Sequence, residues 1–173
     1  GPKPPEVMVP MVRPAMSVAG TERVSALGNT GVTRAAAFIA GAAEARVIDA
    51  IKVGDGLLNQ RHMSLLGLRE LVARERWRAG AREARWISAY LDAGARSPKE
   101  SETRAILVFA GLPNPEVNSD IRRENGDFLG CGDLVYRLWR LLVEYEGRQH
   151  RINLDQWNSD IDRYGGFRGD GWR

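Results

Sequence analysis

The chain has very little cysteine, lysine and histidine, and the first shortage excludes two kinds of site. Cys131 is the single cysteine of the 173 residues, so neither an intrachain disulfide nor a cysteine-based zinc site can form. A lone thiol is typical of a reducing compartment, and we expect a cytoplasmic protein. No apolar run approaches the roughly 18 residues that a membrane-spanning helix needs, and no signal peptide is evident.

Positive charge comes almost entirely from arginine. The net charge is +3, and lysine occurs only at positions 3, 52 and 99. Arginine favours bidentate contacts with phosphate and carboxylate and tolerates partly buried sites. This balance permits nucleic-acid binding without establishing it. The stretches GDGLL and GNTG contain glycine but lack the rest of a phosphate-binding loop, so we interpret both as turns.

Proline content and apolar spacing divide the chain into three parts. Residues 1–32 begin with a proline-rich, extended segment and have room for a strand near GNTG. Residues 33–95 show helical spacing throughout and predict a helical subdomain. Its first two helices end at Asn59, and further helices are expected over 64–78 and 81–93. Residues 96–173 follow a different pattern.

This third part predicts a helix, three strands and another helix. Ser97 is expected to cap the first helix, with Pro98 and Glu100 in its first turn and Gly111 after its end. The stretch PEVNSDIRRENGDFLGCGDLVYRLWRLLVEYEG predicts three strands with an Asn-Gly turn. The last helix is predicted in NLDQWNSDIDRYGG, ending at the two glycines.

The stretch LLVEYEGRQH combines strand-forming residues with closely spaced carboxylates. Glu144 and Glu146 are two residues apart, so on a strand they share a face, where like charges repel. Asp133 follows an earlier strand-like stretch, and a hairpin would bring it to the same end of the sheet as Glu144. Such a cluster is tolerated where a hard divalent cation such as Mg²⁺ neutralises it.

Two more residues complete this candidate site. Glu100 can supply a fourth carboxylate, and His150 can act as an acid or a base. A metal held there could bind a scissile phosphate, polarise it and activate water. By spacing alone, carboxylates that are simply solvated on a sheet are the stronger interpretation.

Three stretches carry a resemblance to a known family, in the order SPKESETRAILVFAGLPNPEVN, GDLVYRLWRLLVEYEGRQHR and QWNSDIDR followed by GW. They resemble successive blocks of a bacterial domain family, common in actinobacteria, that is related to the very-short-patch-repair endonuclease and the PD-(D/E)XK nucleases. The earlier GVTRAAAFIAGAAEARVIDAIKVGDGLL is similar to the helical segment that precedes this domain in abortive-infection antitoxin-like proteins. The resemblance implies an α/β fold. Residues 96–173 would form a restriction-endonuclease-like three-layer core (α-β-β-β-α), with a last strand starting near Trp172.

The resemblance also implies an activity: a Mg²⁺- or Mn²⁺-dependent DNA endonuclease of repair or defence, with DNA as partner and a homodimer as a possible assembly. Asp133, Glu144 and Glu100 match the family's metal-binding carboxylates. Glu146 and His150 match further positions of its catalytic site, and Asp160 and Arg163 match its following helix.

The chain departs from the family pattern at two places. Glu146 stands where the family has Asp and where many superfamily nucleases have Lys, so Arg148 or Arg151 would have to stabilise the phosphate. Gly130 and Gly132 flank Asp133 and are expected to loosen its strand. These departures favour an alternative, a non-catalytic DNA-binding or antitoxin-type regulator with a degenerate site. A protein-interaction module is a third hypothesis.

Arginines and tryptophans outside this cluster have two interpretations each. Arg74, Arg78 and Arg82, with Arg85, would lie near one face of a helix over 70–90 and could follow a phosphate backbone. Glutamates alternate with them, so an ion-paired, solvated face is at least as good an interpretation. Trp139 and Trp157 could stack on bases, but their positions favour the core.

Overall fold

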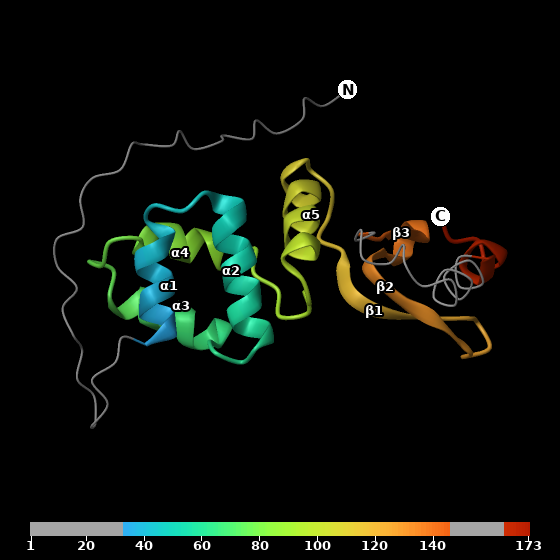
Figure 1. Cartoon of the computed structure of the whole chain (residues 1–173), viewed down its shortest axis with the longest axis horizontal. Helices are drawn as coiled ribbons and strands as arrows, with labels where there is room; N and C mark the ends of the chain where they lie inside the picture. Colours follow the sequence, from blue (N-terminus) through green and yellow to red (C-terminus); the bar gives the residue numbers. More distant parts are fainter. Residues whose placement is uncertain (1–32, 146–164) are drawn as a thin grey trace, which may run out of the picture. The chain divides into compact units, whose positions relative to one another are not determined.

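The computed structural model describes residues 33–145 and 165–173, and the fold is mixed α/β (Figure 1). The predictions for residues 1–32 lie outside the described residues. The elements follow the chain as four helices, a fifth helix and then three strands. Within the described residues, no helix is both long and apolar enough to cross a membrane.

The first four helices surround one apolar core. They are α1 (Arg34–Ala42), α2 (Val47–Asn59), α3 (Leu65–Arg74) and α4 (Ala81–Ile87). Thr33 and Ser64 cap α1 and α3 by accepting backbone N–H groups at 3.2 and 3.0 Å. The core between the helices includes the fully buried side chains of Ile39, Ile51, Leu68, Ala84 and Ile87. The predicted helical character and the end of α2 at Asn59 are confirmed.

Three local predictions in this region are wrong. GDGLL is not a turn but lies inside α2, where a Cβ on Gly54 would meet Leu91 Cδ2 at 2.5 Å, so the glycine makes room for packing. The helix predicted over 64–78 ends at Arg74. The helix predicted over 81–93 ends at Ile87, because backbone groups of the following residues bind side chains of α2 and α5 (described below).

Gly80 separates α3 from α4 and allows two stability predictions. Its φ of +83° is left-handed, and a Cβ there would lie 1.9 Å from the backbone oxygen of Ile39. We expect Gly80→Ala to lower the free energy of unfolding by about 3 kcal/mol or more in urea titrations, since strain and a backbone clash add. Gly111→Ala is the control, because its φ is +95° with nothing within 4 Å of the new Cβ. It should cost only about 1–2 kcal/mol. Equal losses in the two variants would contradict the clash.

The fifth helix, α5 (Pro98–Phe109), has the predicted ends. The Ser97 hydroxyl accepts the Glu100 N–H at 3.2 Å, Pro98 occupies the first turn, and Gly111 follows the C-terminus with positive φ. Among the helices, α5 packs most extensively against α2. The predicted start and end of this helix are therefore confirmed.

Three strands form an antiparallel sheet in the order β1-β2-β3. β1 (Glu116–Arg122) and β2 (Phe128–Tyr136) are joined by a turn containing Asn125 and Gly126, as predicted. A 3₁₀ turn, η1 (Arg137–Trp139), leads to β3 (Leu141–Val143). Trp139 lies on this turn and is half exposed, so its predicted core position is wrong. The reason is that β2 ends before Trp139.

The C-terminal residues pack on this sheet. Phe167 is buried against Ile121 and Val135. Residues 165–169 are helical, so the prediction that Gly165 and Gly166 end a helix is wrong. The Arg173 N–H donates to the Arg140 oxygen, and its own oxygen accepts the Leu142 N–H, both at 2.9 Å. This slanted pattern is that of a parallel strand pair.

Candidate functional site

Asp133 lies on β2, Glu144 directly follows β3, and the register of the two strands places them opposite each other. The last paired residues of β2 and β3 are Leu134 and Val143, and the antiparallel register continued by one residue brings Asp133 opposite Glu144. Residues opposed in this way have Cβ atoms about 4.5–5.5 Å apart. Both are half-buried. Asp133 Oδ2 accepts the Tyr145 N–H at 3.0 Å, which ties its carboxylate to the end of β3.

Asn118 occupies the equivalent position on β1. The pairs Val117 with Leu134 and Ser119 with Gly132 bracket it, so Asn118 lies opposite Asp133. Its φ of +47° is left-handed, which asparagine tolerates better than most residues. Its amide nitrogen donates to Glu100 Oε2 at 2.6 Å and to the Gly94 oxygen at 2.8 Å. Sequence reasoning missed Asn118, since an asparagine within a strand pattern gives no distinct signal.

Glu100 is held at the start of α5. Its side chain is largely buried, and Oε2 accepts the Arg96 N–H at 2.9 Å as well as the Asn118 amide. A carboxylate in the first turn of a helix that accepts a preceding backbone N–H acts as a cap. Glu100 therefore links α5 to β1 through Asn118, the β1 residue that lies opposite Asp133.

Glu100 does not form a described ligand cluster with Asp133 and Glu144. Among residues 33–145 and 165–173, no three His, Cys, Asp or Glu side chains are arranged to hold a metal ion. Glu146, His150, Arg148 and Arg151 lie outside these residues, as do Trp157, Asp160 and Arg163. The described residues bring together two of the predicted ligands, Asp133 and Glu144.

Gly132, next to Asp133, has a packing role that the sequence did not indicate. A Cβ there would meet Leu142 Cδ2 at 2.7 Å and Val135 Cγ2 at 3.0 Å. The glycine therefore leaves space for an apolar side chain of β3 to close over β2. This contact fixes the hairpin that carries the two carboxylates.

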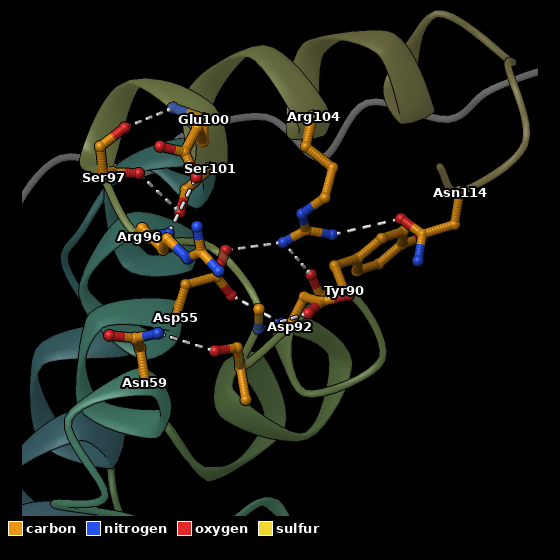
Figure 2. Close-up of polar contacts among 12 residues, drawn as sticks. Asp55, Asn59, Tyr90, Asp92, Arg96, Ser97, Glu100, Ser101, Arg104 and Asn114 are labelled. Carbon is orange, nitrogen blue, oxygen red and sulfur yellow. Dashed lines mark hydrogen bonds and ion pairs between the residues drawn. The ribbon is translucent and has the colours of Figure 1, made fainter. Parts of the chain in front are cut away.

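A buried ion pair joins α5 to the first four helices (Figure 2). Arg104, which is 2% exposed, donates through Nη2 to Asp55 Oδ2 at 2.8 Å and to the Tyr90 oxygen at 2.7 Å. Nη1 donates to Asn114 Oδ1 at 3.3 Å. The other Asp55 oxygen accepts the Asp92 N–H at 2.7 Å. We call these residues, Asp55, Tyr90, Asp92, Arg104 and Asn114, the Arg104 network.

Burial has the largest effect on the pKa of the Asp55 carboxyl. Removal from water raises the pKa of its carboxyl, and the Arg104 charge and the Asp92 N–H lower it by less. The sequence did not predict this network, because GDGLL, which contains Asp55, was interpreted as a turn and nothing near Arg104 in the sequence identifies its partner. The signal available was Asp55, the single charged residue on the otherwise apolar buried face of α2.

The arginines predicted to follow a nucleic acid do not share a helix. Arg74 is the last residue of α3, Arg78 lies in the following turn, and Arg82 lies in α4, because Gly80 interrupts the helix. The prediction that these arginines lie near one face of a single helix is therefore wrong. Arg74 pairs with Glu75 at 3.1 Å, and Arg78 also pairs with Glu75. The Arg78 hydrogen bond is the main reason that the pKa of Glu75 is lowered. A nucleic-acid role for these three arginines stays a prediction.

Comparison with known proteins identifies relatives that carry no assigned function. No family model and no solved structure match the chain. It is 28% identical over 118 residues to uncharacterized protein MT2308 of Mycobacterium tuberculosis strain CDC 1551 / Oshkosh. It has the same identity to uncharacterized protein Rv2248 of strain ATCC 25618 / H37Rv. The match covers 68% of this chain and 43% of each relative, so the chain spans less than half of their length. The resemblance to restriction endonucleases stays a prediction.

Proposed function

We propose that the chain is a metal-dependent nuclease that hydrolyses phosphodiester bonds of DNA. The observation that carries this proposal is the position of Asp133 opposite Glu144 across the β2–β3 pair. Two half-buried carboxylates facing each other across a strand pair form a donor set whose negative charge a divalent cation would neutralise. Carboxylate oxygens are the ligands that Mg²⁺ and Mn²⁺ prefer.

In this proposal Asp133 and Glu144 would hold the cation. The Tyr145 N–H orients the Asp133 carboxylate through Oδ2, and within the described residues Oδ1 makes no hydrogen bond. A divalent cation bound there would hold the scissile phosphate and acidify a water molecule. Hydrolysis forms a bond from a water oxygen to phosphorus and breaks the bond from phosphorus to the leaving oxygen, which departs as a hydroxyl after taking a proton from a second water molecule. We assign His150 to accept the water proton, Glu146 to assist it, and Arg148 or Arg151 to neutralise the phosphate.

For Glu100 the described contacts support a positioning role. Oε2 is shared by two hydrogen bonds, from Arg96 N–H and from Asn118. These bonds fix the first turn of α5 against β1, beside the position opposite Asp133. Glu100 would then act on the site through Asn118 and the sheet.

We further propose that residues 96–173 adopt the restriction-endonuclease-like arrangement. The order α5, β1, β2, β3 agrees with it. The parallel pairing of Arg173 with β3, after helical residues 165–169, agrees with a strand–helix–strand crossover.

A non-catalytic DNA-binding regulator is the second candidate. Two observations favour it: Glu100 is engaged in capping, and Glu146 replaces the family Asp. Under this hypothesis the carboxylates would be structural, and the chain would bind DNA and leave it intact.

Plasmid nicking decides between the two candidates. Purified protein is incubated with supercoiled plasmid and Mg²⁺, Mn²⁺ or EDTA, and the open-circular product is quantified. The nuclease proposal expects nicking with either metal and none with EDTA. DNA binding without nicking under every metal condition would overturn the nuclease and support the regulator.

A further inference from the structure

A polar hollow of about 680 Å³ lies between the β1–β2 turn and the C-terminal residues. Three segments far apart in sequence line it: the turn, the residue before β3 and residues 169–172. Arg122, Arg123 and Arg140 supply its positive charge, and Glu124 and Asp170 its negative charge. We call this hollow the arginine groove. It shares no residue with the Asp133–Glu144 pair.

One residue, Asp170, holds two of the three guanidinium groups. Its carboxylate accepts Arg123 Nε at 3.0 Å, and its backbone oxygen accepts Arg140 Nη1 at 2.9 Å. The Arg140 backbone is fixed in turn, since its oxygen accepts the Arg173 N–H at 2.9 Å. Within the described residues the Arg123 Nη atoms make no hydrogen bond. Because Nε is used for anchoring, the two Nη groups of this guanidinium are left as donors for a ligand.

The remaining counter-charge is weakly held. Glu124 lies 3.5 Å from Arg140 Nη2, and its side chain is 96% exposed. An exposed pair of this kind contributes little, so an incoming anion can replace Glu124 at small cost. Arg122 is directed elsewhere, toward Asp120 and over the Phe128 ring. Arg123 and Arg140 are therefore the two donors that an anion would meet.

Gly171 keeps the space beside Arg140 open. Its φ is +80°, and a Cβ there would lie 3.3 Å from Arg140 Nη1. Gly169 has nothing within 4 Å of its Cβ position. The backbone thus approaches the Arg140 guanidinium at one glycine, where a side chain would press on it.

We propose that the arginine groove binds phosphate groups of a nucleic-acid backbone. Guanidinium groups match phosphate oxygens in geometry and charge, and two anchored arginines suit a ligand with successive phosphates. The hollow is open and polar, which suits a polymer passing through it. The inference needs binding alone, and holds whether or not the Asp133–Glu144 site cuts.

Fluorescence anisotropy with a short labelled DNA duplex tests this, in EDTA so that hydrolysis cannot contribute. At about 100 mM salt we expect Arg123→Gln and Arg140→Gln each to weaken binding about 5- to 10-fold. Each should also lower the slope of log affinity against log salt by about one. Glu124→Gln should strengthen binding about 2- to 3-fold, and this gain cannot come from misfolding.

Arg46→Gln is the matched control, since Arg46 also pairs through Nε with a carboxylate, Asp49, at 2.7 Å. It should leave affinity unchanged. Equal weakening by Arg46→Gln, or weaker binding by Glu124→Gln, would overturn the proposal. Competition by poly-glutamate as strong as by unlabelled DNA would also overturn it in favour of an acidic protein. A labelled RNA strand identifies which nucleic acid is preferred. If the protein binds DNA normally but never nicks it, the arginine-groove proposal stands and the nuclease proposal is wrong.

Discussion

Asp133→Asn is expected to slow metal-dependent nicking by about 100- to 1000-fold, because a neutral amide is a poor ligand for the proposed cation. The substitution keeps the size of the side chain. Its amide oxygen can still accept the Tyr145 N–H, so the β2–β3 pair should stay intact. The measurement is the rate of conversion of supercoiled plasmid at saturating Mg²⁺. Glu144→Gln should show a loss of the same order.

The control for this prediction is Asp120→Asn. Asp120 is an exposed carboxylate on β1, 3.5 Å from Arg122, and it faces neither Asp133 nor Glu144 in the register. Its removal changes net charge by the same amount and should leave the nicking rate within about twofold of wild type. A full rate in Asp133→Asn would remove Asp133 from the chemistry.

Arg104→Met is expected to lower the free energy of unfolding by about 3–5 kcal/mol, because it leaves the buried Asp55 carboxylate without its cationic partner. Asp55 and Arg104 are both almost fully buried, so water cannot replace the lost contact. Urea unfolding followed by circular dichroism measures the effect. Arg69→Met is the control, since Arg69 also donates to a backbone oxygen, that of Ser88 at 3.1 Å, but has no described carboxylate partner. It should cost about 1 kcal/mol.

The loss in Arg104→Met should depend on pH. Burial raises the pKa of Asp55, and without Arg104 that pKa rises further. A folded-state pKa above the unfolded value gives a contribution that is present at low pH and is lost as pH rises through the folded pKa. The variant should therefore be closest to wild type near about pH 4 and furthest from it at neutral pH. A loss that is constant over this range would mean that packing, and not the carboxylate, carries the effect.

Local signals in the sequence were sufficient for most elements. The capping residues around Ser97, the Asn-Gly turn and the helical spacing after Thr33 each predicted an element that the structure contains. These signals depend on neighbours within a few residues, so they can be read from the sequence alone. The opposition of Asp133 and Glu144 followed from the hairpin that such signals predicted.

The parts that the sequence could not supply depend on distant partners. The end of α4 at Ile87 is set by Asp55 and Arg104, which bind the backbone of Tyr90 and Asp92. The break at Gly80 is set by its approach to the Ile39 oxygen. Asn118 gains its role only when α5 packs beside β1. No periodicity in the chain encodes these contacts.

The left-handed backbone of Asn118 has a consequence for assembly. β1 is an outer strand of the described sheet, and open strand edges invite pairing with a second copy. Here the irregular backbone at Asn118 interrupts the strand, and the charged residues Glu116, Asp120 and Arg122 are exposed along it. These are features by which natural proteins protect an edge against aggregation. We therefore expect β1, the strand that supports the candidate site, to remain free of edge-to-edge pairing with a second copy.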